Sequence, residues 1–244
     1  SYDFALGLRR RLAGAGFHEA RSGTLTGSRD QEAFSTGGVI AVRNPMGEEH
    51  STLRGSLIPG LLDSVARNLR HGAESVRLFE IGRVYQTPEK NKAEERLRLG
   101  LVMTGRVHGE NWRGEPARSL DLFDLKGVLS RFGAVTFRAA SHARLPLALE
   151  ILISGKPAGL LGILSPADAR EVMVGGHQGQ ILVAELDLAL LEKSTAALSK
   201  GTAALPKFPS VRRDLALLLD AAVPYAVVEE SALAAKEELL TGII

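Results

Sequence analysis

Cysteine is absent from the 244 residues, and the chain has one tryptophan and three tyrosines. The lack of cysteine excludes disulfides, thiolate metal sites and a thiol nucleophile. No apolar run approaches the ~18 residues needed to cross a bilayer. The first residues show no signal-peptide pattern, so the expected compartment is the cytoplasm.

The chain also lacks a large excess of charge of either sign. It has 30 Lys and Arg residues and 28 Asp and Glu residues, which gives a formal charge of +2. A nearly neutral chain has no global electrostatic attraction to nucleic acid, so any contact with RNA must be local. The histidines are isolated, without the i, i+4 spacing of a helical metal site. We therefore predict no metal ligands.

Hydrophobic residues make up 45% of the chain, enough for one core and a small second domain. Apolar side chains recur every three to four positions after residue 3, which predicts an amphipathic helix that ends at Gly16. The same spacing predicts a helix over 57–70, with Ser56 as its N-cap and Pro59 in its first turn.

Strand and helix patterns continue along the chain at 75–86, 96–105, 119–133, 147–166 and 180–193. The first two are strands separated by a polar stretch, which predicts an antiparallel hairpin with a long loop. The third is a helix capped by Asp121 or Asp124. The fourth is two strands around a Gly-Lys-Pro turn, and the fifth a strand that leads into a helix. This order predicts an α+β fold.

A linker is predicted over residues 194–206, because this stretch is small, polar and ends in proline. It would separate a domain at 1–195 from a second one at 205–244. The second segment has room for a strand, a helix and the beginning of another strand.

The run at 43–86, which contains "FEIGRVYQ", resembles the beta chain of bacterial phenylalanyl-tRNA synthetases. Residues 111–127 and 155–166 match this family in the same order. Residues 205–224 are similar to the opening of its ferredoxin-like anticodon-binding domain. The resemblance implies a class II synthetase-like antiparallel sheet flanked by helices, followed by the start of a ferredoxin-like α/β sandwich.

The resemblance also implies a function. In this family the alpha chain forms the adenylate with ATP and Mg²⁺, and the core-like part of the beta chain is catalytically silent. Such a region would support the alpha chain in an alpha2beta2 heterotetramer and help to position tRNA(Phe), with no membrane contact. ATP and Mg²⁺ would then belong to the complete enzyme, with no cofactor in this chain.

Two positions argue for this silence. Class II strands of the type F-E-I-G carry an arginine for the ATP α-phosphate, and here its place is held by Gln86, with Pro88 at the place of a glutamate. The helix expected to bring the second ATP-binding arginine lies within 175–193, which contains no arginine. We therefore predict no catalytic or cofactor-binding residue, and we expect Arg54 and Glu80 to form a structural ion pair in the vestigial pocket.

The remaining predictions concern partners. Leu8 and Leu12 of the first helix are predicted to lie in the subunit interface, and the 57–70 helix in the core. Phe208, Arg212 and Arg213 are predicted to contact tRNA, unless Phe208 and one arginine only pack the first strand of their domain. Two other functions stay open: a free-standing synthetase paralogue that acts as a protein-interaction module, and an active class II-type ATP-dependent ligase.

Overall fold

The computed structural model describes residues 1–27, 33–35, 37–89, 92–109, 112, 118–173, 179–197, 209, 211–235, 240 and 243. The chain divides into two compact units, Ser1–Gly201 and Thr202–Ile244. Every β-strand among the described residues belongs to the first unit.

The strands of the first unit are β1 (His18–Glu19), β2 (Leu25–Thr26), β3 (Ile40–Ala41), β4 (Thr52–Leu53), β5 (Val76–Glu89), β6 (Lys92–Thr104), β7 (Val135–His142), β8 (Leu145–Ile153), β9 (Lys156–Ile163) and β10 (Leu182–Asp187). Its helices are α1 (Tyr2–Gly14), the short 3-10 helix η1 (Glu48–His50), α3 (Ile58–Arg70), α4 (Leu122–Ser130), α5 (Pro166–Val172) and α6 (Leu188–Ala197).

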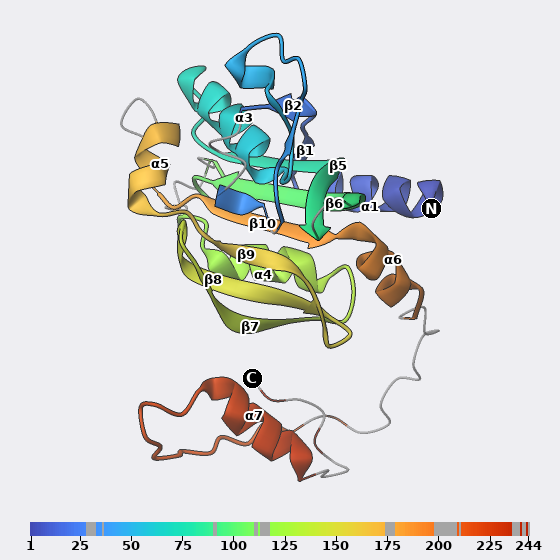
Figure 1. Cartoon of the computed structure of the whole chain (residues 1–244). Helices are drawn as coiled ribbons and strands as arrows, with labels where there is room; N and C mark the ends of the chain where they lie inside the picture. Colours follow the sequence, from blue (N-terminus) through green and yellow to red (C-terminus); the bar gives the residue numbers. More distant parts are fainter. Residues whose placement is uncertain are drawn as a thin grey trace. The chain divides into compact units, whose positions relative to one another are not determined.

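Seven strands form one sheet in the order β1-β5-β6-β10-β9-β8-β7 (Figure 1). All neighbours are antiparallel except β1 and β5, which are parallel. A smaller sheet has the order β2-β4-β3. The predicted α+β class is confirmed; the class II-like and ferredoxin-like assignments stay predictions.

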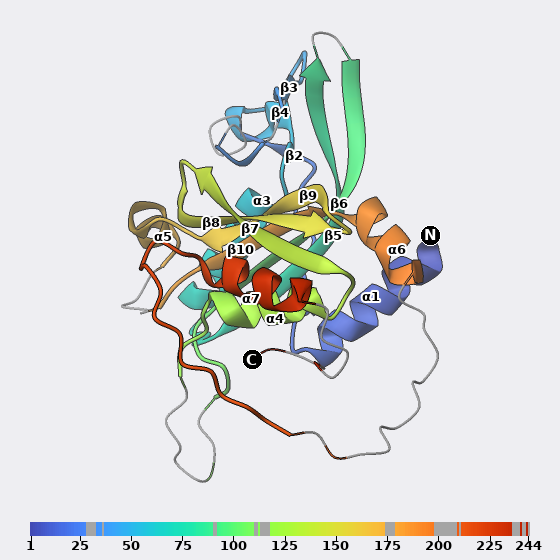
Figure 2. The same cartoon turned by 90° about the horizontal axis from the view of Figure 1, so that it is seen from below.

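Successive side chains of a strand point to opposite faces of the sheet, and the central strands of the large sheet are covered by helices on both faces. On one face, Phe79 and Leu101 pack with leucines of α1, α4 and α6, which lie across the near side of the sheet in Figure 2. On the other face, Leu78 and Val102 pack with α3 and with Ala169 of α5. A sheet covered on both sides explains why the central strands are almost continuously apolar.

The β5–β6 hairpin is longer than the sequence predicts. Pairing continues to Glu89 and Lys92, so most of the predicted long loop is strand. The outer part projects from the sheet beside β3 and β4 (Figure 2), and its polar side chains pair across the ladder, as in the 2.8 Å ion pair of Arg83 with Glu95. Backbone pairing therefore extends the hairpin beyond the apolar core, where the hydrophobic pattern carries no signal.

The turn between β8 and β9 lies one residue earlier than predicted. Ile153 pairs with Lys156, so the two turn residues are Ser154 and Gly155. Both have positive φ, 50° and 75°. A two-residue hairpin turn of this kind requires positive φ at both positions, which glycine adopts without strain.

Helix ends follow the predicted chemistry at α4. Asp121 is its N-cap, and Asp124 completes a capping box by accepting from the backbone N–H of Asp121 at 2.9 Å. The sequence prediction missed several elements, among them the edge strand β7, the short helix α5 and the two-residue strand β1. Each is short or weakly patterned, and a two-residue strand gives no periodicity to detect.

The second unit contains helix α7 (Tyr225–Ala234) and residues 211–220, which form neither a helix nor a strand. The predicted first strand is not formed in this described stretch, which has no neighbouring strand to complete its hydrogen bonds. Across the described parts of the chain, no helix is both long and apolar enough to span a membrane.

Candidate functional site

The face of the sheet below the start of α3 carries two buried carboxylates. Glu80 of β5 and Glu185 of β10 are both registered with Gly100 of β6, so they flank it on neighbouring strands. Buried carboxylates are rare unless they are paired. This row is therefore where a binding or catalytic function of the sheet would be sought.

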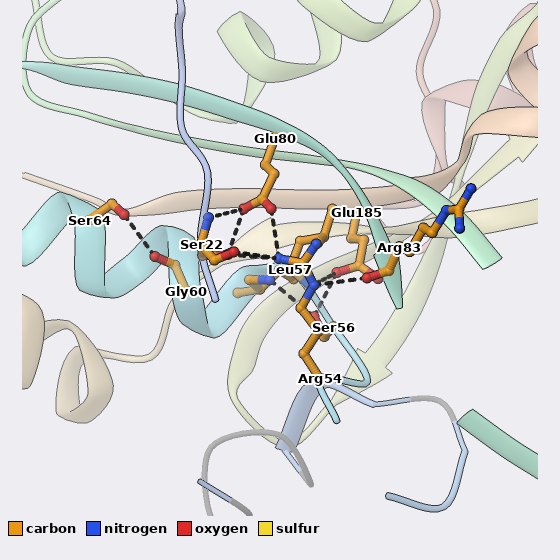
Figure 3. Close-up of polar contacts among 10 residues, drawn as sticks. Ser22, Arg54, Ser56, Leu57, Gly60, Ser64, Glu80, Arg83 and Glu185 are labelled. Atoms are coloured by element: carbon orange, nitrogen blue, oxygen red, sulfur yellow. Dashed lines mark hydrogen bonds and ion pairs between the residues drawn. The ribbon is translucent and has the colours of Figure 1, made fainter. Parts of the chain in front are cut away.

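Glu80 is paired with Arg54, as predicted (Figure 3). Arg54 Nη1 lies 2.6 Å from Glu80 Oε1, and the two side chains are only 7% and 3% exposed. Arg54 Nε donates to the carbonyl oxygen of Arg83 at 2.8 Å. Ser22 closes the network, because its hydroxyl donates to Glu80 Oε2 at 2.6 Å and accepts from Arg54 Nη1 at 2.9 Å.

Glu185 instead caps helix α3. Its Oε2 accepts from the Ser56 hydroxyl at 2.6 Å and from the backbone N–H of Leu57 at 2.7 Å. The N-cap residue is Leu57, so the prediction of Ser56 is wrong by one position. Ser56 Oγ nevertheless accepts from the N–H of Ile58 at 3.1 Å. The Glu185 carboxyl group, from strand β10, thus lies at the N-terminus of α3, where the helix dipole favours negative charge.

Burial raises the pKa of the Glu185 carboxyl above its ordinary range, against the opposing hydrogen bond from Ser56 and the charge of Arg98. Arg98 is itself buried on β6, and its Nε has no hydrogen-bond partner among the described residues. The carboxylates of Glu80 and Glu185 are both engaged in contacts within the protein, the first with Arg54 and Ser22 and the second with the start of α3.

Two glycines allow this arrangement. A Cβ on Gly82 would overlap Arg54 Nη2, so only glycine lets the guanidinium lie flat on β5. A Cβ on Gly100 would lie 2.8 Å from Leu61 Cδ1 and 3.0 Å from Leu57 Cβ. Helix α3 therefore packs directly on the sheet backbone at this position.

Gln86 lies on the same strand as Glu80, near the outer part of β5. It is 6% exposed, and its Nε2 donates to the carbonyl oxygen of Gly55 at 2.8 Å. Because the β4–α3 segment covers it, Gln86 does not face an open site. Gln86 is thus a neutral, buried side chain whose amide is bonded to the protein backbone.

The predicted interface residues lie inside the protein. Leu8 is 3% exposed and Leu12 0%, and both pack in the apolar core on the α1 face of the sheet. This chain covers them itself, so their side chains are not available to another subunit. The periodicity showed which face of α1 is apolar, but not that the sheet was wide enough to bury all of it.

The predicted tRNA-contacting residues belong to the second unit. Arg212 and Arg213 are exposed in the stretch 211–220. Phe208 lies outside the described residues. Their predicted role is neither supported nor opposed by these positions.

Sequence reasoning missed Ser22 and Glu185, and it identified Ser56 only as the N-cap of the 57–70 helix. The available signal for Glu185 was its position as a single acid inside the apolar run "ILVAEL", because a charge in a buried strand requires a partner. Its partner Ser56 is 129 residues away along the chain, and Ser22 looks like an ordinary loop residue.

Comparison with known proteins shows which family this chain resembles. A family described as "Phenylalanyl tRNA synthetase beta chain CLM domain" matches residues 3–188. The chain is 36% identical over 237 residues to the phenylalanine–tRNA ligase beta subunit of Bacillus subtilis, covering 91% of this chain and 28% of that protein. The corresponding subunit of Symbiobacterium thermophilum is 33% identical over 233 residues, covering 89% and 26%.

A third beta subunit, from Nitratidesulfovibrio vulgaris, is 28% identical over 255 residues, which covers 99% of this chain and 31% of that protein. The chain thus spans less than a third of the length of these relatives.

Proposed function

The chain belongs to the phenylalanyl-tRNA synthetase beta chain family, and from this premise we propose that it is a catalytically silent region which supports the catalytic alpha chain. The observation that carries the proposal is the filled face of the sheet. Arg54, Leu57 and helix α3 cover this face, and each is held by buried contacts.

Adenylate formation needs a cation that stabilises the charge growing on the α-phosphate. By the family resemblance, Gln86 holds the place of this cation, and its side chain is neutral and buried. We therefore assign ATP and Mg²⁺ to the alpha chain of the complete enzyme. The complete assembly is proposed to be an alpha2beta2 heterotetramer in the cytoplasm that charges tRNA(Phe).

The first prediction follows from the filled site. Calorimetric titration of the purified chain with ATP and Mg²⁺ should show no saturable binding, and pyrophosphate exchange should stay at background. The variant Gln86→Arg should also be inactive, because the new guanidinium would enter a covered position beside Gly55. Micromolar ATP affinity in the unmodified chain would instead favour the active-ligase alternative.

Assembly with the alpha chain decides the proposal as a whole. Co-expression of a complete beta subunit containing this region with its alpha chain should give one heterotetrameric species on sizing and tRNA(Phe) charging activity. A region that never assembles with the alpha chain would favour the free-standing interaction module. We propose that α1 contributes to assembly through its exposed face, which includes Tyr2 and Arg10, since Leu8 and Leu12 are covered.

The second prediction concerns RNA. We propose that Arg212 and Arg213 contact tRNA phosphates, with Phe208 beside them, when the anticodon-binding domain is complete. In the intact enzyme, replacing both arginines by alanine should weaken tRNA(Phe) binding and reduce the salt dependence of the affinity. Adenylate formation by the alpha chain should be unchanged. Filter binding at several salt concentrations measures the effect, and an unaltered salt slope would place the RNA site elsewhere.

A further inference from the structure

A groove lies on the α3 side of the sheet, away from the buried carboxylates. Helices α3 and α5 lie on the same side of the sheet (Figure 1), and the groove between them is completed by Arg144 from the turn between β7 and β8. Its volume is about 380 Å³, within the range of small-molecule sites. Its apolar wall includes Leu62, Leu164 and Val172.

Three arginines line this groove. Arg67 and Arg70 come from the last turns of α3, and Arg144 from the turn that faces them. Neither Arg67 nor Arg70 forms an ion pair with any described residue, and both are exposed. Favourable interaction with the C-terminus of the helix dipole accounts for arginines on α3. Arg144 reaches the same hollow from a different element, where it is paired with Asp168 of α5.

The carboxylates of the groove are mostly engaged. Asp168 is paired with Arg144, accepts from the Ser165 hydroxyl at 2.5 Å, and is held in the first turn of α5. Asp63 also has an interaction partner within the chain. Glu171 forms no ion pair with the described residues. Arg67 and Arg70 are therefore the cationic groups of the groove that no printed ion pair with a described residue neutralises, and they can still receive a carboxylate.

We propose that this groove binds a small organic monocarboxylate with an apolar body. The planar guanidinium fork matches carboxylate geometry, and the aliphatic wall between α3 and α5 receives the apolar part. The acidic residues at the rim disfavour phosphates, whose charge at neutral pH approaches −2. The site is separate from the filled face of the sheet, and the proposal goes beyond the support of an alpha chain.

Three matched probes test this assignment by calorimetry on the whole chain: 3-phenylpropionate, its uncharged amide and acetate. The propionate should bind at least about tenfold more tightly than either of the others, because only it has both the charge and the apolar body. The variant R67A/R70A should weaken its binding by about tenfold or more. Glu171→Gln should strengthen it, since a like charge is removed.

Arg131→Ala is the matched control, because Arg131 is an exposed C-cap arginine of α4 on the other face of the sheet. It should leave the affinity for 3-phenylpropionate unchanged. Equal binding of the propionate and its amide, or no saturation by about 10 mM propionate, would overturn the proposal. Weaker binding of 3-phenylpropionate to Glu171→Gln would also overturn it, since Glu171 would then contribute to binding and not repel the carboxylate.

Discussion

Replacing Glu80 by glutamine should destabilise the chain by about 3–5 kcal/mol, the range for breaking a buried ion pair from one side. The change preserves the shape of the side chain but leaves the Arg54 guanidinium buried without a counter-charge. An arginine cannot relieve this by losing its proton. Urea unfolding followed by circular dichroism measures the loss, provided that both proteins unfold in a single transition.

A double variant separates the buried charge from the loss of packing. Arg54→Met combined with Glu80→Leu removes both charges and should be more stable than Glu80→Gln alone. Glu95→Gln is the control for an exposed pair, because Arg83 and Glu95 are 64% and 46% exposed. It should change stability by less than about 1 kcal/mol. Similar losses in Glu80→Gln and Glu95→Gln would contradict the structural role assigned to the buried pair.

Replacing Leu8 by aspartate should prevent stable folding of the first unit, because the carboxylate would enter an apolar core with no described partner. The sequence alone favoured a surface role for this leucine, with weakened assembly as the main effect. Burial within the chain changes that expectation. Leu61→Ala, on the opposite face of the sheet, should cost ~2–5 kcal/mol, since Leu61 is fully buried against Gly100.

Arg10→Asp gives the comparison within α1. Arg10 is exposed on the same helix, so this substitution should change folding stability by only about 0.5 kcal/mol. Thermal unfolding of the three variants beside the unmodified chain measures the differences. A Leu8→Asp protein that folds normally but fails to assemble with the alpha chain would restore the interface assignment.

Several elements of this protein could be predicted from local sequence features. Apolar spacing located α1 and α3, and Asp121 identified the start of α4, because helix periodicity and capping act within a few residues. The ion pair of Arg54 with Glu80 was also expected, since the family resemblance placed both residues in a vestigial pocket. Gln86, in the place of a phosphate-binding arginine, already argued against catalysis.

The sequence by itself therefore determined the α+β class, the family and the loss of the charged ATP-binding positions, all of which depend on residue type and local order. Only the tertiary structure decided that Leu8 and Leu12 are covered, that Glu185 caps α3, and that Arg67, Arg70 and Arg144 surround one groove. These facts depend on strand register and on contacts between distant segments. Such contacts arise when the sheet and its helices pack together, and they leave no periodic signal in the chain.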